Sequence, residues 1–151
     1  DEITILWGSM YGMTGKAVDY AEKILQSKGV KYNKLEMPLE SESEMVATVF
    51  KSAGIIIAAP TYEYKLFPPV AAALNELGRK RVTGKAAFRF GSYGWSGGAE
   101  KELNEILERN KMNWDLIESV EFEGAPKEED LIKVEAGVLK LIEKMREKVV
   151  E

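Results

Sequence analysis

Histidine and cysteine are both absent from the 151 residues of this chain. Without histidine, the chain cannot form a Ser-His-Asp triad or a His-ligated metal site. Without cysteine, it cannot form disulfides, thiolate metal sites or iron–sulfur clusters of its own. Such a composition fits the reducing cytoplasm, which is where we expect the protein to work. These two absences exclude more enzyme classes than any residue that is present.

Long apolar runs and an excess of positive charge are missing as well. No apolar run approaches the roughly 20 residues that a membrane-spanning helix needs, and the first one is too short for a signal peptide. We therefore expect no membrane partner. The net charge is −4, so we do not expect a nucleic-acid partner either. With 45% hydrophobic and 30% charged residues, the chain has the composition of a globular protein. Its length predicts a single domain over residues 1–151.

Strand-like and helix-like patterns alternate along the chain. The expected strands are Ile3–Trp7, Lys31–Glu36, Gly54–Ala59, Ala86–Gly91 and Leu116–Phe122. Apolar spacing and capping residues predict helices over Gly15–Lys28, after Ser41 or Ser43 (with Met45, Val46, Val49 and Phe50), from Pro68-Pro69 onward, around Leu103, Ile106 and Leu107, and over Glu128–Glu151. Five such units with short connections predict an α/β fold, a doubly wound five-stranded parallel sheet in the order 2-1-3-4-5.

Charged residues fall in two of the expected strands. Glu118, Glu121 and Glu123 in the last strand indicate a sheet edge, where charge discourages the addition of another strand. Arg89 interrupts the fourth strand, which the pattern places inside the sheet. The sequence offers no reason for a charge at that position.

The loops after strands 1, 3 and 4 should converge, because ligands of such sheets bind beyond the carboxyl ends of the strands where strand order reverses. The first loop opens a helix, and its hydroxyls, free N–H groups and helix dipole suit a phosphate. A plain helix cap is the alternative. This loop is not a nucleoside-triphosphate P-loop, because Ala17 stands where Ser or Thr is needed. Its candidate residues are Ser9, Met10, Tyr11, Gly12, Met13 and Thr14.

Aromatic residues fill the other two loops. We expect Tyr62 and Trp95 to cover the two sides of a planar ring, although ordinary packing could also occupy them. Glycines in the third loop allow a ligand close to the backbone. Residues 94–98 read G-x-S-x-G, but without histidine a nucleophile elbow is excluded. The candidates are Pro60, Thr61, Tyr62, Glu63 and Tyr64 in the second loop, and Ser92, Tyr93, Gly94, Trp95, Ser96, Gly97 and Gly98 in the third.

A phosphate site, a slot for a flat ring and close backbone contact together describe flavin mononucleotide, FMN. ATP would need a carboxylate site for Mg²⁺, which the sequence does not offer. A carboxylate beside the ring, such as Glu63, should lower the semiquinone/hydroquinone potential of the flavin, because the fully reduced ring tends to be an anion. An exposed Glu63 with little effect is the alternative.

Three motifs resemble the flavodoxin-like domain of flavodiiron proteins (A-type flavoproteins), and the similarity covers nearly the whole chain. The resemblance implies a flavodoxin-like fold, FMN phosphate held by Ser9, Tyr11, Gly12 and Thr14, and ring contacts from Thr61, Tyr62 and residues 92–98. The resembling residues are Ser9-Met10-Tyr11-Gly12 with Thr14, Pro60-Thr61-Tyr62 with Phe67-Pro68-Pro69, and Phe90-Gly91-Ser92-Tyr93-Gly94-Trp95-Ser96-Gly97-Gly98-Ala99.

The same resemblance implies partners. FMN would take electrons from a redox protein and pass them to the diiron domain of the same full-length protein, across a homodimer, for the reduction of oxygen or nitric oxide. Because the chain begins at Asp1 without Met, we expect it to be the C-terminal domain of a longer protein. A free-standing flavodoxin and a flavodoxin-like NAD(P)H quinone reductase remain alternatives, and the domain alone should not turn over oxygen or nitric oxide.

Overall fold

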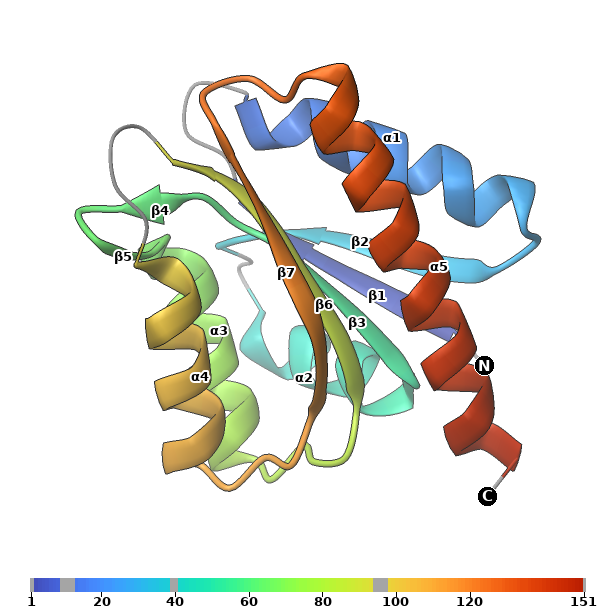
Figure 1. Ribbon diagram of the computed structural model, residues 1–151. Helices are drawn as coiled ribbons and strands as arrows, with labels where there is room; N and C mark the ends of the chain where they lie inside the picture. The colour runs from blue at the N-terminus through green and yellow to red at the C-terminus, as the bar shows by residue number, and fades with distance from the viewer. Residues whose placement is uncertain (1, 9–12, 39–40, 94–97, 151) are drawn as a thin grey trace.

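A five-stranded parallel sheet runs through the centre of the molecule (Figure 1). The computed structural model describes residues 2–8, 13–38, 41–93 and 98–150. The strand order is β2-β1-β3-β6-β7, which is the predicted order 2-1-3-4-5 when only the strands of this sheet are counted. The strands are β1 (Glu2–Trp7), β2 (Lys31–Glu36), β3 (Gly54–Ala58), β6 (Ala86–Tyr93) and β7 (Asp115–Glu123).

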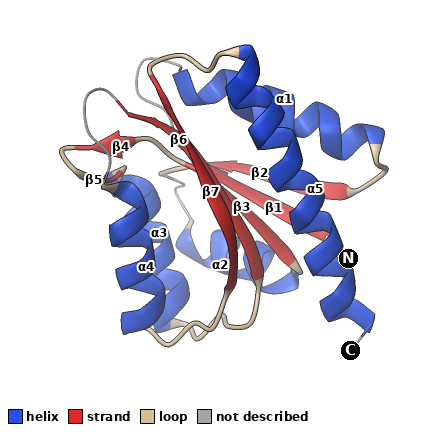
Figure 2. Cartoon of the chain, in the orientation of Figure 1, coloured by secondary structure: helices blue, strands red, loops and turns tan. Residues whose placement is uncertain are grey.

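Helices cover both faces of the sheet (Figure 2). One face packs against α1 and α5, and the opposite face packs against α2, α3 and α4. None of these helices, as far as the structure describes them, is long and apolar enough to cross a membrane. Their bounds are α1 (Met13–Ser27), α2 (Glu42–Lys51), α3 (Pro68–Arg79), α4 (Ala99–Arg109) and α5 (Glu128–Val150).

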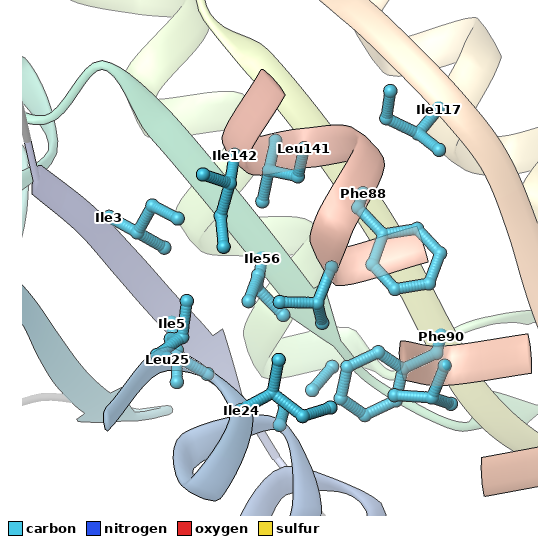
Figure 3. Close-up of a cluster of buried hydrophobic side chains, with 14 of the residues drawn as sticks. Ile3, Ile5, Ile24, Leu25, Ile56, Phe88, Phe90, Ile117, Leu141 and Ile142 are labelled. Atoms are coloured by element: carbon cyan, nitrogen blue, oxygen red, sulfur yellow. The ribbon is translucent and has the colours of Figure 1, made fainter. Parts of the chain in front are cut away.

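The continuously apolar run of β3 is explained by its place in the middle of the sheet. Ile56 belongs to the core on the α1/α5 side, together with Phe88 and Leu141 (Figure 3). Ile55 and Ile57 belong to the core on the other side. All three isoleucines are fully buried, and each such burial stabilises the fold by about 1.5–3 kcal/mol. A strand that is covered on both faces has no polar face, as the sequence predicted.

A small hairpin occupies the segment that the sequence predicted as a loop after β3. It consists of β4 (Thr61–Tyr62) and β5 (Lys65–Leu66), paired antiparallel. The two turn residues, Glu63 and Tyr64, have φ values of 47° and 66°. A two-residue hairpin turn of type I′ needs positive φ at both positions and is usually signalled by Asn-Gly. Because neither residue here is glycine or asparagine, the turn could not be recognised from the sequence.

Other element ends differ modestly from the prediction. Helix α1 begins at Met13 rather than Gly15, and β6 continues through Tyr93, so Ser92 and Tyr93 belong to a strand and not to the glycine-rich loop. The expected cap of α2 is Ser41, whose hydroxyl accepts a hydrogen bond from the Glu44 amide at 3.2 Å. Phe50 does not join the buried face of α2, because its side chain is 69% exposed.

Strand β7 forms the predicted edge of the sheet, but one of its glutamates, Glu121, pairs with a buried side chain instead of only discouraging the addition of another strand. Its register against β6 shifts between Phe88, which pairs with Ile117, and Phe90, which pairs with Val120. The extra β7 residue is a bulge, and a bulge turns neighbouring side chains to new directions. Glu121 consequently reaches Arg89, with 2.7 Å between its Oε1 and Nη1 of the arginine.

Candidate cofactor site

Three neighbouring strands, β1, β3 and β6, end at the same edge of the sheet. The chain leaves β1 for α1 on one face and leaves β3 for the hairpin and α3 on the other face. The connections therefore diverge at this edge, which is the arrangement that creates a ligand-binding crevice in doubly wound sheets. The candidate residues of the sequence analysis lie on these connections.

Thr14 stands at the beginning of α1, and its side chain is completely buried. Its Oγ1 lies 3.3 Å from Oγ of Ser92, so the structure brings these two candidates together, one from α1 and the other from the end of β6. The first turn of α1 contains no acidic residue, so nothing there neutralises the positive end of the helix dipole. This end of α1 fits a phosphate group. Ser9, Met10, Tyr11 and Gly12 lie outside the described residues, as does the side chain of Met13.

The β4–β5 hairpin carries the candidates of the second loop. Tyr62 and Tyr64 are 38% and 58% exposed, which leaves aromatic surface at this edge. Oγ1 of Thr61 is buried and has no hydrogen-bond partner within the described part of the protein. A buried hydroxyl without a partner among the described residues is available to form a hydrogen bond with a ligand. Nε1 of Trp7, the last residue of β1, is also buried without a partner among the described residues, but its ring packs on the α1/α5 core. The Thr61 hydroxyl is therefore the atom that fits a bound cofactor at this edge.

The third loop contacts the hairpin at Gly98. A Cβ at Gly98 would overlap the backbone carbonyl oxygen of Tyr64, so only glycine permits this approach. A second connection comes from Glu102 in α4, whose Oε1 accepts a hydrogen bond from the Leu66 amide at 2.9 Å. The second and third loops are therefore joined, as predicted from the strand order. Gly94, Trp95, Ser96 and Gly97 lie outside the described residues, so the expected stacking of Trp95 stays a prediction.

Backbone contacts between the strand ends form the floor beneath these loops. The Gly8 amide donates to the Ala58 carbonyl at 3.0 Å, and the Ala59 amide donates to the Phe90 carbonyl at 3.1 Å. A Cβ at Gly91 would overlap the Ala59 carbonyl oxygen. The Pro60 carbonyl accepts from the Phe67 amide at 3.0 Å and closes the base of the hairpin. The ends of β1, β3 and β6 are thus fixed relative to one another.

Arg89 lies under this floor, and its side chain is fully buried. Its Nη2 donates to the Ala59 carbonyl at 2.8 Å, and its Nη1 donates to Glu121 Oε1 at 2.7 Å. Burial lowers the pKa of the guanidinium, while Glu121 and Glu100 act in the opposite direction. Sequence reasoning missed this arrangement. The only indication of this ion pair in the sequence was the charge of Arg89 inside an apolar strand, together with Glu121 in the next strand.

Metal ligands do not gather anywhere in the described ranges: no group of three or more His, Cys, Asp or Glu side chains is placed to hold an ion. The fit to a phosphate and a flat ring at this edge rests instead on the amino end of α1, the Thr61 hydroxyl and the exposed tyrosines of the hairpin.

The flavodoxin family matches residues 5–137 of the sequence. The chain belongs to the flavodoxin family. Domains of this family bind FMN and transfer electrons, so FMN is the cofactor of this domain.

Curated relatives of this domain are larger proteins. The anaerobic nitric oxide reductase flavorubredoxin of Vibrio vulnificus (strain YJ016) is 33% identical over 109 residues, which are 71% of this chain and 22% of that protein. The protein of the same name from Escherichia coli O1:K1 / APEC is 30% identical over 110 residues, 72% of this chain and 23% of that protein. This chain spans about a fifth of the length of the curated relatives it matches.

Solved structures share the fold both within larger proteins and as a separate chain. Rubredoxin oxygen:oxidoreductase from Desulfovibrio gigas matches with a TM-score of 0.89 and 21% identity, over 99% of this chain and 37% of that one. The flavodiiron protein of Giardia intestinalis matches with a TM-score of 0.85 and 26% identity, over 95% and 36% of the two chains. A flavodoxin from the domain Archaea matches with a TM-score of 0.81 and 21% identity, over 97% and 99%.

Replacing Glu63 with glutamine should raise the reduction potential of the bound flavin slightly. Glu63 sits in the exposed turn of the hairpin, and a nearby carboxylate disfavours the anionic reduced ring. The rise should shrink at high salt, because exposed charges are screened. The potential can be measured by equilibrium reduction against a reference dye, with Glu105→Gln on the exposed side of α4 as the control. An unchanged potential in Glu63→Gln at low salt would show that the charge of Glu63 does not affect the reduction potential of the flavin.

Proposed function

We propose that this domain receives electrons from a redox protein and passes them through FMN to a diiron site that lies outside these 151 residues. The observation that carries the proposal is the size of the relatives: flavorubredoxin of Vibrio vulnificus matches 71% of this chain with only 22% of its own length. The sequence contains neither His nor Cys, the usual ligands of redox-active iron. The terminal reduction of oxygen or nitric oxide therefore belongs to another part of the protein.

The geometry supports a specific division of the site between the three loops. The phosphate is held at the amino end of α1, where Thr14 is buried and the helix dipole is unopposed. The ring lies between the hairpin and residues 92–98, where the unpaired Thr61 hydroxyl offers it a hydrogen bond. In this arrangement the candidates of the three loops act as cofactor-binding residues: Ser9, Met10, Tyr11, Gly12, Met13, Thr14, Pro60, Thr61, Tyr62, Glu63, Tyr64, Ser92, Tyr93, Gly94, Trp95, Ser96, Gly97 and Gly98.

Electrons leave the flavin through the edge that the hairpin borders. Tyr62 and Tyr64 expose aromatic surface there, and such surface is common where proteins dock. We place the diiron domain against this edge, with a homodimer bringing the flavin of one subunit to the iron of the other, in the cytoplasm. This arrangement keeps the two redox centres in neighbouring domains.

The test compares this domain with the full-length gene product. Both are loaded with FMN, reduced without oxygen and mixed with nitric oxide or with oxygen. We expect flavin reduction in both proteins, but sustained reductase turnover only in the full-length protein. A gene that encodes no iron-binding segment besides this domain would contradict the proposal.

A free-standing flavodoxin is the second candidate, favoured by the archaeal flavodoxin that matches over 97% of this chain and 99% of its own. In that case the reduced domain would pass electrons to several separate acceptor proteins. A quinone reductase would in addition oxidise NADH or NADPH directly. Adding each nicotinamide to the FMN-loaded domain distinguishes this activity, which both electron-transfer functions lack.

A further inference from the structure

Arg89 is a charged side chain in an interior strand of the sheet, and 0% of its surface reaches solvent. The neighbouring side chains in β6, Phe88 and Phe90, lie in the core on the α1/α5 side. The alternation of a strand therefore points Arg89 toward the opposite face, where α3 and α4 pack.

Stability alone does not explain why an arginine occupies this position. Exchanging a buried ion pair for apolar side chains of similar volume is often neutral or even stabilising, because two charges must lose their water. Nε of Arg89 has no partner among the described residues, so the desolvation of this side chain is not fully compensated. The reason for the charge must lie in what the guanidinium contacts.

One of those contacts is the floor of the cofactor site. Nη2 donates to the carbonyl oxygen of Ala59 at 2.8 Å, and Gly91 packs against the same oxygen. Ala59 is followed by Pro60, and then by the hairpin that carries Thr61. The orientation of the Ala59–Pro60 peptide therefore decides where the hairpin begins. The guanidinium fixes that orientation from below.

The two charges of the ion pair between Arg89 and Glu121 differ in their exposure to solvent. Glu121 bonds to Nη1 at 2.7 Å, yet its side chain is 22% exposed, whereas that of Arg89 is 0% exposed. Water screens the carboxylate more strongly than the guanidinium, since screening falls with burial. The pair consequently presents its positive end to the interior and to the loops above, and its negative end to solvent at the sheet edge.

We propose that Arg89 is a positioning residue of the flavin site that raises the reduction potential of bound FMN. It holds the Ala59 carbonyl in place and sets a buried positive charge beneath the loops, where that charge favours the anionic reduced flavin over the neutral oxidised one. The inference rests on the FMN site of the proposed function. It does not depend on the diiron acceptor.

Three variants test the proposal in the FMN-loaded domain. Arg89→Met removes the charge and keeps the length of the side chain. Glu121→Gln keeps the bond to Ala59 and leaves Arg89 uncompensated. Arg89→Lys keeps the charge, but a single ammonium group cannot reproduce the two-pronged geometry by which the guanidinium donates to both Ala59 and Glu121. For each variant, the dissociation constants of oxidised and fully reduced FMN and the two-electron potential are measured, together with the melting temperature of the apo-domain.

We expect Arg89→Met to weaken reduced FMN about tenfold more than oxidised FMN, which lowers the two-electron potential by about 30 mV. Glu121→Gln should shift the potential upward, and Arg89→Lys should fall between the parent and Arg89→Met. Both Arg89→Met and Glu121→Gln should lower the melting temperature of the apo-domain, because each breaks the ion pair. A purely structural role would produce that loss of stability without opposite shifts in potential.

Equal potentials in all variants, or shifts of the same sign in Arg89→Met and Glu121→Gln, would overturn the proposal. Should Arg89→Met fail to fold, a Glu121→Gln potential that stays level or falls would be sufficient to overturn it. A domain that shows the expected shifts but comes from a protein without reductase turnover would uphold the role of Arg89 and contradict the diiron proposal.

Discussion

Replacing Gly91 with alanine is expected to lower the free energy of unfolding by about 3 kcal/mol and to weaken FMN binding about tenfold. A Cβ at this position would overlap the carbonyl oxygen of Ala59. That oxygen cannot move freely, since it accepts from Arg89 at 2.8 Å while the Ala59 amide donates to Phe90 at 3.1 Å. The added methyl group must therefore separate β3 from β6 where the hairpin begins.

Gly29→Ala is the matched control for Gly91→Ala. It adds the same methyl group at a residue with φ of 66° and nothing within 4 Å of the new atom. It should cost about 1 kcal/mol for the left-handed backbone and leave FMN affinity unchanged. Chemical denaturation of the apo-domain and fluorescence titration with FMN measure both quantities. Equal effects of the two substitutions would show that the contact between Gly91 and Ala59 does not shape the site.

Replacing Thr14 with valine is expected to weaken FMN binding by about 1–3 kcal/mol, the usual contribution of a hydrogen bond to a charged group. This range corresponds to roughly 5- to 150-fold in the dissociation constant. Thr14 is fully buried at the amino end of α1, and its hydroxyl is 3.3 Å from that of Ser92. Valine has the same shape but cannot donate a proton to a phosphate oxygen.

Thr48→Val provides the control for Thr14→Val. The Thr48 hydroxyl donates to the Glu44 carbonyl at 2.8 Å on the exposed side of α2, where no cofactor contact is proposed. FMN affinity should be unchanged in this variant. Titration of riboflavin, which lacks the phosphate, adds a second discrimination, because Thr14→Val should not alter riboflavin binding. If FMN affinity is unchanged in Thr14→Val, Thr14 does not bind the phosphate.

The order of the sheet and the convergence of the three connections could be predicted from the sequence because both depend on local patterns. The alternation of apolar runs and helical spacing requires parallel strands with crossover helices. The unbroken run Ile55-Ile56-Ile57 requires a strand covered on both faces. Parallel strands end at one edge, so the segments that carry Thr14, Thr61 and Ser92 had to meet. The contacts between Thr14 and Ser92 and between Gly98 and Tyr64 agree with that expectation.

Three features that shape the site depended on contacts between distant residues, and these were decided only by the tertiary structure. The hairpin turn forces Glu63 and Tyr64 into positive φ without glycine, because packing against Gly98 and the bond from Leu66 to Glu102 hold it there.

The other two features meet at Arg89. The close approach of Gly91 to Ala59 follows from the pairing of β3 with β6, and the register shift in β7 turns Glu121 toward the guanidinium. Composition and periodicity describe what each segment prefers by itself. They carry no information about a carbonyl oxygen 30 positions away from the arginine that binds it. The sequence alone therefore identified the sheet, the loops and the cofactor. The packing of the folded chain decided which contacts fix the ends of β3 and β6 beneath the site.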